Sequence, residues 1–309
     1  MKKDLISIGL MSSDEIKGIL SLSKEIKNNP GKFSNVLKGK SLALIFEKPS
    51  NRTYVSFAVG MYQLGGNALY LGPEQIKLGV RETIHDVAKT LSRYVDGIVL
   101  RTFGHEKLLE MARYASVPVI NGLSDYSHPC QALADTFTIL EKFGDLKNRT
   151  MVYIGDGNNV CNSLLLISAK LGINFNVATP RGYEPDYLLF KNTVAAAARR
   201  GVKISLSRDP ESAAKGADVI YTDVWASMGH EDEAAKRKRD FKKFQVTGKL
   251  VSLAKKNCLV MHCLPAHRGE EISDDAIDGK HSVVFDQAEN RLHVQKAILV
   301  KLLKHGVKS

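Results

Sequence analysis

The stretch Ser41-Leu42-Ala43-Leu44-Ile45-Phe46-Glu47-Lys48-Pro49-Ser50-Asn51-Arg52-Thr53 passes from an apolar run through a polar turn into a helical pattern. The apolar run has the length of a buried strand, and Ser50 can cap a helix predicted near 51–64. A strand followed at once by a helix is the repeating step of α/β folds with parallel sheets. The stretch therefore predicts that fold class.

The same step recurs along the chain, on both sides of the polar, turn-prone segment 144–148. In the first half we predict further strands at 97–100 and 117–120, and helices near 81–93 and 129–143. In the second half we predict strands at 151–154, 173–178, 202–206, 218–221, 258–261 and 282–285, and a last helix at about 287–303. We expect an α/β protein of two doubly wound parallel-sheet domains joined by interdomain helices. The domains are predicted at 1–146 and 147–309, with the terminal helix packing back on the first.

The 309 residues suit two domains, and 44 Lys plus Arg against 33 Asp plus Glu give a net charge of +11. Charge alone does not choose between nucleic acid, an anionic membrane and a small anionic substrate. Aromatic residues make up only 7% of the chain, which argues against a platform for stacking bases. We interpret the basic run 236–243 as a solvated helical face, because acidic residues are mixed into it.

Four cysteines, Cys130, Cys161, Cys258 and Cys263, form no Cys-x-x-Cys pair, so free thiols in a reducing compartment are expected. The first twenty residues contain no apolar run long enough for a signal peptide or a membrane span. We therefore expect a cytoplasmic protein with neither a membrane nor a nucleic acid as its partner.

Polar residues follow several predicted strands of the first half, where ligands of parallel sheets bind. Ser50, Arg52 and Thr53 offer a helix start, a guanidinium and a hydroxyl to a phosphate, although a plain capped helix is the alternative. Arg101 falls directly after the strand predicted at 97–100, where a guanidinium can polarise a carbonyl or hold a phosphate, and an ordinary surface arginine is the alternative. His128 begins a helix whose field favours neutral imidazole, and Gln131 shares its first turn. A capping or packed histidine is the alternative.

In the second half, Gly155-Asp156-Gly157-Asn158-Asn159 begins like a dinucleotide fingerprint, but Val160 replaces its third glycine and no ribose-binding acid follows. NAD binding is therefore not expected, and the amides suit a carboxylate or a zwitterion. Asp223 follows a strand and can pair with an ammonium group, while Ser227-Met228-Gly229 can close over a ligand. An ordinary surface loop is the alternative.

The stretch His262-Cys263-Leu264-Pro265 also follows a strand, and the bond before Pro265 can be cis. It would aim the Cys263 thiol and the Leu264 carbonyl into a cleft. A metal site of His262, Cys263 and His267 lacks a fourth ligand at zinc spacing, so no metal is expected. Arg291, in the first turns of the last helix, has a cap or a surface ion pair as its simplest role.

Four of these stretches, in this order, resemble the ornithine carbamoyltransferase family across nearly the whole chain. They are Phe46–Thr53, similar to its Ser-x-Arg-Thr phosphate motif, His128-Pro129-Cys130-Gln131, the Asp-x-x-x-Ser-Met-Gly stretch 223–229, and His262-Cys263-Leu264-Pro265. Two positions depart from the family pattern: Asn51 replaces its usual threonine, and Tyr54 stands where an arginine often follows.

The resemblance implies transfer of the carbamoyl group of carbamoyl phosphate to the δ-amine of L-ornithine, without cofactor or metal, in a cytoplasmic homotrimer with shared active sites. It implies Arg101, His128 and Cys263 as catalytic residues. It implies carbamoyl phosphate contacts from Ser50, Asn51, Arg52, Thr53, Arg101, His128, Gln131, Cys263, Leu264, Arg291 and, from a neighbouring subunit, Gln75. It implies ornithine contacts from Asn159, Asp223, Ser227 and Met228.

Two other functions remain open. One is a carbamoyltransferase for another amine, such as putrescine or N-acetylornithine, although Ser227-Met228-Gly229 favours an amino acid that carries an α-carboxylate. The other is a non-catalytic regulatory subunit, which the presence of Arg52, His128 and Cys263 together disfavours.

Overall fold

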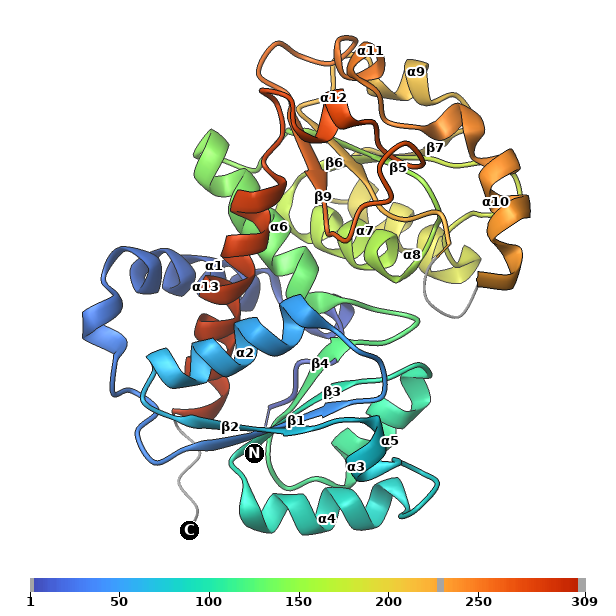
Figure 1. Cartoon of the computed structure of the whole chain (residues 1–309). Coiled ribbons are helices and arrows are strands. Elements are labelled where there is room, and N and C mark those ends of the chain that lie inside the picture. The colour runs from blue at the N-terminus through green and yellow to red at the C-terminus, as the bar shows by residue number, and fades with distance from the viewer. Residues whose placement is uncertain (1–2, 227–230, 305–309) are drawn as a thin grey trace. The chain divides into compact units, whose positions relative to one another are not determined.

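The computed structural model describes residues 3–226 and 231–304, and the chain divides into two compact units (Figure 1). One unit comprises residues 1–137 and 289–309, and the other comprises residues 138–288. Helices α6 (Pro129–Phe143) and α13 (Val284–Leu303) each contribute residues to both units. The division thus falls inside α6, ahead of the turn-prone segment 144–148, because the end of this helix packs with the second unit.

The first unit contains a parallel sheet in the order β2-β1-β3-β4. Its strands are β1 (Ser41–Phe46), β2 (Asn67–Leu71), β3 (Gly97–Arg101) and β4 (Val119–Leu123). Its helices, besides parts of α6 and α13, are η1 (Ile8–Leu10), α1 (Ser13–Asn28), η2 (Pro30–Phe33), α2 (Asn51–Gln63), α3 (Pro73–Ile76), α4 (Ile84–Tyr94) and α5 (His105–Tyr114). Figure 1 shows α2 on one face of this sheet and α4 with α5 on the other. Alternate strand residues such as Ala43 and Ile45 share a buried core with α4 and α5.

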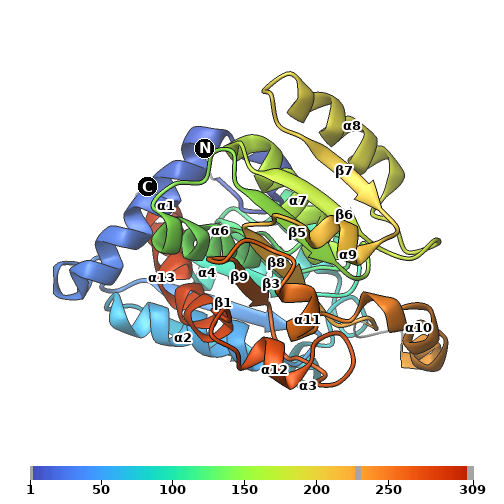
Figure 2. The same cartoon turned by 90° about the horizontal axis from the view of Figure 1, so that it is seen from above.

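The second unit contains a parallel sheet in the order β7-β6-β5-β8-β9. Its strands are β5 (Thr150–Ile154), β6 (Asn174–Ala178), β7 (Ile204–Ser207), β8 (Val219–Thr222) and β9 (Leu259–His262). Its remaining helices are α7 (Asn159–Leu171), α8 (Tyr187–Ala198), α9 (Pro210–Ala214), η3 (Glu231–Glu233), α10 (Ala234–Asp240), η4 (Lys242–Phe244), α11 (Gly248–Val251) and α12 (Asp274–Ile277). Figure 2 shows β5, β6 and β7 in succession, with α8 beside β7 at the edge.

Each sheet reverses its winding direction at one pair of neighbouring strands. In the first unit β2 lies on one side of β1, and β3 and β4 lie on the other. In the second unit β6 and β7 lie on one side of β5, and β8 and β9 lie on the other. The switch points are therefore β1/β3 and β5/β8, and ligands of doubly wound sheets bind beyond the carboxyl ends of such a pair.

An aspartate fixes the amino end of each switch pair. Asp96, directly before β3, accepts the backbone N–H of Ser41 at the start of β1, with a distance of 2.9 Å. Asp218, directly before β8, accepts the backbone N–H of Thr150 at the start of β5, also at 2.9 Å. These bonds tie the first residue of each central strand to its neighbour, and so help to set the register that aligns the opposite, ligand-binding ends.

Most predicted strands are confirmed, but one strand was missed and one predicted strand is wrong. The edge strand β2 was not predicted, although four of its five residues, Ala68 to Leu71, are apolar; Leu69 and Tyr70 are 47% and 42% exposed, because the strand is paired on one side only. The strand predicted at 282–285 is wrong: Ser282 forms only an isolated bridge to Val260, and α13 begins at Val284. A short apolar run does not distinguish a strand from the first turn of a buried helix. No helix in residues 3–226 or 231–304 has the length and apolarity needed to cross a bilayer.

We predict that Asp218→Asn lowers the free energy of unfolding by about 2–3 kcal/mol, because charge-assisted hydrogen bonds to a buried group are lost. The Asp218 side chain is 1% exposed and also binds the ammonium of Lys255 at 2.8 Å. Urea denaturation measures the change, with the exposed Asp232→Asn as the matched control. Equal stability of the two variants would contradict the role given to Asp218.

Candidate active site

The phosphate motif predicted from the sequence begins α2 at the carboxyl end of β1. Ser50 is the N-cap, and its hydroxyl accepts the backbone N–H of Thr53 at 3.4 Å. Asn51 is exposed, Arg52 is half-buried and Thr53 is buried. The cap predicted for Ser50 is therefore confirmed, and the helix start presents its side chains at the edge of the sheet where anions bind.

Arg291 of α13 joins this motif to α6. Its guanidinium donates to the Thr53 hydroxyl at 3.1 Å and to the side-chain oxygen of Gln131 at 2.6 Å. Gln131 in turn donates to Asp135 at 2.7 Å. Arg291 is 2% exposed, so the surface role that its position in the sequence favoured is wrong. Asp135 was not singled out from the sequence, although its spacing of four residues from Gln131 on a helix was a usable signal.

His128 lies buried among three arginines. Burial, followed by the charges of Arg291, Arg101 and Arg52, holds the pKa of His128 well below its usual range. The neutral imidazole expected from the sequence is therefore confirmed, but its main cause is desolvation and neighbouring guanidinium groups. Three cations beside a neutral donor form a site suited to a small, highly charged anion that also carries a carbonyl.

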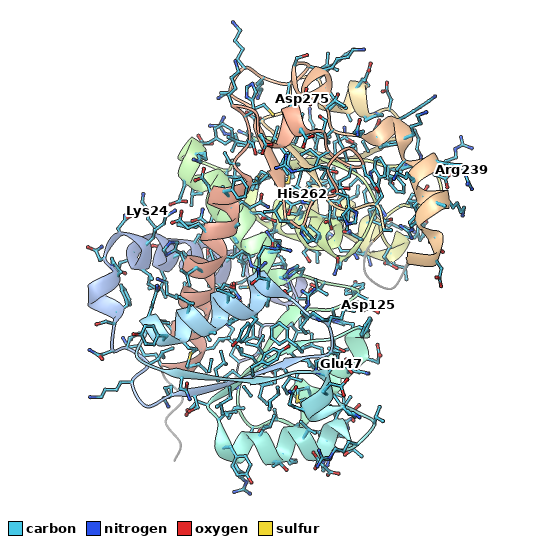
Figure 3. All side chains as sticks on the ribbon, in the orientation of Figure 1. Lys24, Glu47, Asp125, Arg239, His262 and Asp275 are labelled. Carbon is cyan, nitrogen blue, oxygen red and sulfur yellow. The ribbon has the colours of Figure 1, made fainter. Side chains whose placement is uncertain are left out.

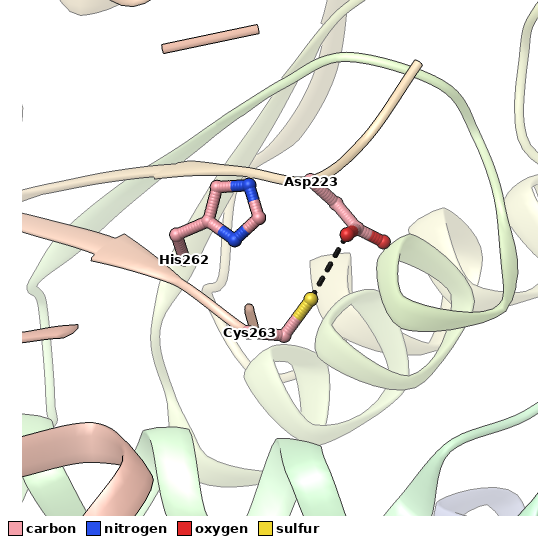
Figure 4. Close-up of side chains that lie close together, drawn as sticks. All are labelled: Asp223, His262 and Cys263. Atoms are coloured by element: carbon pink, nitrogen blue, oxygen red, sulfur yellow. Dashed lines mark hydrogen bonds between the residues drawn. The ribbon is translucent and has the colours of Figure 1, made fainter. Parts of the chain in front are cut away.

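In the second unit, Asp223 and Cys263 meet beyond β8 and β9 (Figure 4). The Cys263 thiol donates to Asp223 Oδ1 at 2.9 Å. The side-chain amide of Asn158 donates to Asp223 Oδ2 at 2.8 Å. Asp223 is only 6% exposed, so its carboxylate is held in a fixed orientation next to the thiol. This arrangement suits an ammonium group or an amine that must lose a proton.

Asn158 has a second contact that changes one expectation. Its side-chain oxygen accepts the backbone N–H groups of Val160 and Cys161 at 3.0 and 3.1 Å and so caps α7. Of the two amides expected to suit a carboxylate or a zwitterion, that of Asn158 is therefore bound within the protein. Asn159, the first residue of α7, is half-buried.

A metal is a less suitable occupant, although Asp223, His262 and Cys263 place potential ligand atoms within 4.8 Å of one another. The His262 Nδ1 accepts the backbone N–H of Leu264 at 2.8 Å, so its lone pair is already bound. Its Nε2 lies 3.0 Å from Glu271. The trio therefore offers two available donors, fewer than a tetrahedral zinc site requires from the protein.

The four cysteines are free, as predicted, and differ in burial. Cys130, Cys161 and Cys258 are buried, and burial raises the pKa of the Cys130 and Cys258 thiols to about 12. Cys263 is half-buried. Of the four, Cys263 is thus the thiol that can reach a ligand.

Other predicted site residues lie apart from these contacts. Gln75 is exposed on α3. Leu264 is half-buried with φ of 57°, and the bond to Pro265 is cis. Ser227 and Met228 lie outside the described residues.

Known proteins match the chain over almost all of its length. Residues 3–141 match the family described as "Aspartate/ornithine carbamoyltransferase, carbamoyl-P binding domain", and residues 147–302 match its "Asp/Orn binding domain". An ornithine carbamoyltransferase of Thermococcus kodakarensis is 54% identical over 99% of this chain and 98% of its own. A Pyrococcus furiosus relative named "Ornithine carbamoyltransferase, anabolic" is 54% identical over the same shares.

The solved structure of ornithine carbamoyltransferase from Pyrococcus furiosus has a TM-score of 0.95 to this chain, at 53% identity over 99% of this chain and 98% of that one. Because the identity extends over both units and both family domains match, the comparison shows the family of the whole chain as well as its fold. The chain belongs to the ornithine carbamoyltransferase family.

Proposed function

We propose that this chain transfers the carbamoyl group of carbamoyl phosphate to the δ-amine of L-ornithine, giving L-citrulline and phosphate. The observation that carries the proposal is the cluster of Arg52, Arg101 and Arg291 around a neutral His128. A phosphate ester of a carbamoyl group needs both cations for its phosphate and a neutral donor for its carbonyl. This cluster supplies the two in one place.

In the first unit, the motif Ser50–Thr53 binds the phosphate, with Asn51 acting through its backbone N–H and Arg52 through its guanidinium. Arg101 and His128 donate to the carbonyl oxygen, where negative charge develops during attack. Gln131 and Arg291, which are bonded to each other, hold the carbamoyl end. Arg101 and His128 are therefore the catalytic residues of this unit.

In the second unit, Asp223 and Asn159 bind ornithine, and Ser227 and Met228 complete its site. Ornithine must lose a proton before its δ-nitrogen can attack. The Cys263 sulfur accepts that proton while its own thiol proton passes along the hydrogen bond to Asp223 Oδ1, so the carboxylate is the final acceptor. The nitrogen then forms a bond to the carbamoyl carbon and loses its second proton to the departing phosphate, and the bond from that carbon to the phosphate oxygen breaks. Phosphate leaves with the electron pair, and its charge is stabilised by Arg52.

We further propose a cytoplasmic homotrimer. Exposed apolar side chains gather on α2 and β2 of the first unit, including Tyr54, Val55, Leu69 and Tyr70. Patches of this kind mark protein interfaces. Gln75 is exposed on the neighbouring α3, from which it reaches the site of an adjacent subunit. The free thiols fit the reducing cytoplasm.

We expect citrulline to form far faster than any other product when carbamoyl phosphate is offered separately with L-ornithine, putrescine, N-acetylornithine and aspartate. Product formation measured for each acceptor tests the reaction and the acceptor together, and Arg52→Ala is the control that should lose turnover. A preference for another amine would overturn the ornithine assignment. Absence of turnover with every acceptor would favour a regulatory subunit.

We expect His128→Gln to lower kcat about 10²- to 10³-fold, because one donor to the developing oxyanion is lost. Because the pKa of His128 lies well below the usual histidine value near 6.5, its ring stays neutral at pH 6.5 and above. Plots of kcat/KM for carbamoyl phosphate from pH 6 to 8 should therefore have the same shape in parent and variant. A loss of activity near pH 6.5 that disappears in the variant would contradict this assignment.

We expect Arg52→Ala and Gln75→Ala each to lose most activity alone, and co-expression of the two to restore it in mixed trimers. Recovery should approach about a quarter of the parental activity, because one site in four combines an intact Arg52 with a neighbour's intact Gln75. Light scattering with size-exclusion chromatography measures the assembly. Trimers without recovered activity would show that the sites are not shared.

A further inference from the structure

The basic run 236–243 contains one residue that does not behave as a solvated charge. Lys236, Lys238 and Arg239 are exposed on α10, and Figure 3 shows the Arg239 side chain extending outward. Arg237 is 7% exposed. The interpretation of the run as a solvated face is therefore correct for its lysines and wrong for Arg237.

The Arg237 guanidinium bonds to three separate segments of the second unit. It donates to the Asp156 carboxylate at 2.8 Å, to the Trp225 carbonyl at 2.8 Å and to Glu233 at 2.9 Å. It also lies 5.0 Å from the centre of the Tyr183 ring. A planar guanidinium with several donors in fixed directions can hold such partners at once, which a lysine ammonium on a flexible chain cannot do equally well.

Two of these segments carry residues proposed to bind ornithine. Asp156 lies in the loop between β5 and α7, and its carbonyl accepts the backbone N–H of Asn158 at 2.7 Å. Asn158 in turn orients Asp223 through its side chain. Trp225 follows Asp223 by two residues and is 5% exposed. Arg237 thus fixes the backbone on both sides of the Asn158–Asp223 hydrogen bond through Asp156 and Trp225.

The loop that holds Asp156 has little freedom to adopt another position. A Cβ atom at Gly157 would lie 2.2 Å from the backbone nitrogen of Pro185, so this glycine is packed directly against a neighbouring chain segment. The Gly157 N–H also donates to the Tyr183 carbonyl at 2.8 Å. The loop is therefore clamped between the 183–185 segment and Arg237.

Arg237 also changes the charge of the region where the amine is proposed to bind. Asp156 and Asp223 both lie close enough to Cys161 for their charges to raise the pKa of its thiol, after the larger effect of burial. An ammonium substrate entering this region would be attracted by either carboxylate. The bond from Arg237 neutralises Asp156 and leaves Asp223 as the charge that directs the amine.

We propose that Arg237 is a positioning residue for the amino-acid acceptor: it holds the Asp156 loop and the Trp225 backbone so that Asn158 keeps the Asp223 carboxylate in one orientation toward the amine. The inference rests on the proposed function and deepens it. Arg237 acts through these partners and is not itself catalytic.

Arg237→Gln should raise the KM for ornithine about 10- to 100-fold, because a displacement of about 1 Å at a positioned group has effects of this size. The KM for carbamoyl phosphate should stay within a factor of two. Arg239→Gln is the matched control, with the same chemical change on the same helix, and should keep both KM values. The KM for ornithine of Arg237→Lys should lie between those of the parent and of Arg237→Gln. If Arg237→Gln does not fold, Arg237→Lys is measured in its place.

A double variant separates positioning from loss of packing. With Asp156→Asn added to Arg237→Gln, the uncompensated carboxylate is removed, and the KM for ornithine should be lower than in Arg237→Gln alone. Parent-like KM values in Arg237→Gln, or equal increases for both substrates, would overturn the inference. Failure of the parent enzyme to make citrulline would instead overturn the proposed function, so the two outcomes are distinguishable.

Discussion

The switch in winding direction at β1/β3 and at β5/β8 is the constraint on which the rest of the structure depends. At such a pair the chain leaves the two strands toward opposite sides, so the loops beyond their carboxyl ends diverge and leave polar groups accessible. Both proposed substrate sites use these loops. Asp96 and Asp218 hold the same pairs at their amino ends. The strand register is therefore held at the amino ends of the strands, and it aligns the ligand-binding loops at their carboxyl ends.

The two units place opposite charges at their switch points. In the first, Arg52, Arg101 and Arg291 surround His128, and burial of that histidine keeps it neutral. In the second, Asp223 is bonded to the Cys263 thiol and to an amide. Buried charges of one sign are unfavourable without a partner, so each arrangement lowers the free energy of a ligand of the opposite sign. An anionic carbamoyl donor and an amine acceptor supply those two signs.

A run of charged residues in a sequence predicts an exposed helix face, but it does not show which charged residue of the run is buried. In the run 236–243, the helical period places one residue in four toward the protein, and these residues are Arg237 and Phe241. Arg291 is a comparable case, since a position in the first turns of a helix favours solvent exposure. Both arginines are buried because carboxylate, carbonyl or hydroxyl oxygens far away in the sequence bind them. Such partners are fixed by tertiary packing.

The sequence by itself determined the order of most strands and helices, the Ser50 cap, the free thiols and the motifs that identify the family, because these depend on neighbouring residues or on local patterns. Tertiary structure alone decided the edge strand β2, the early start of α13 and the contacts of Asn158, Asp135 and Arg237. It also decided why His128 is neutral, since the three arginines around it come from separate elements. Propensity and spacing act over a few residues, whereas burial and charge are summed over everything that folding brings together.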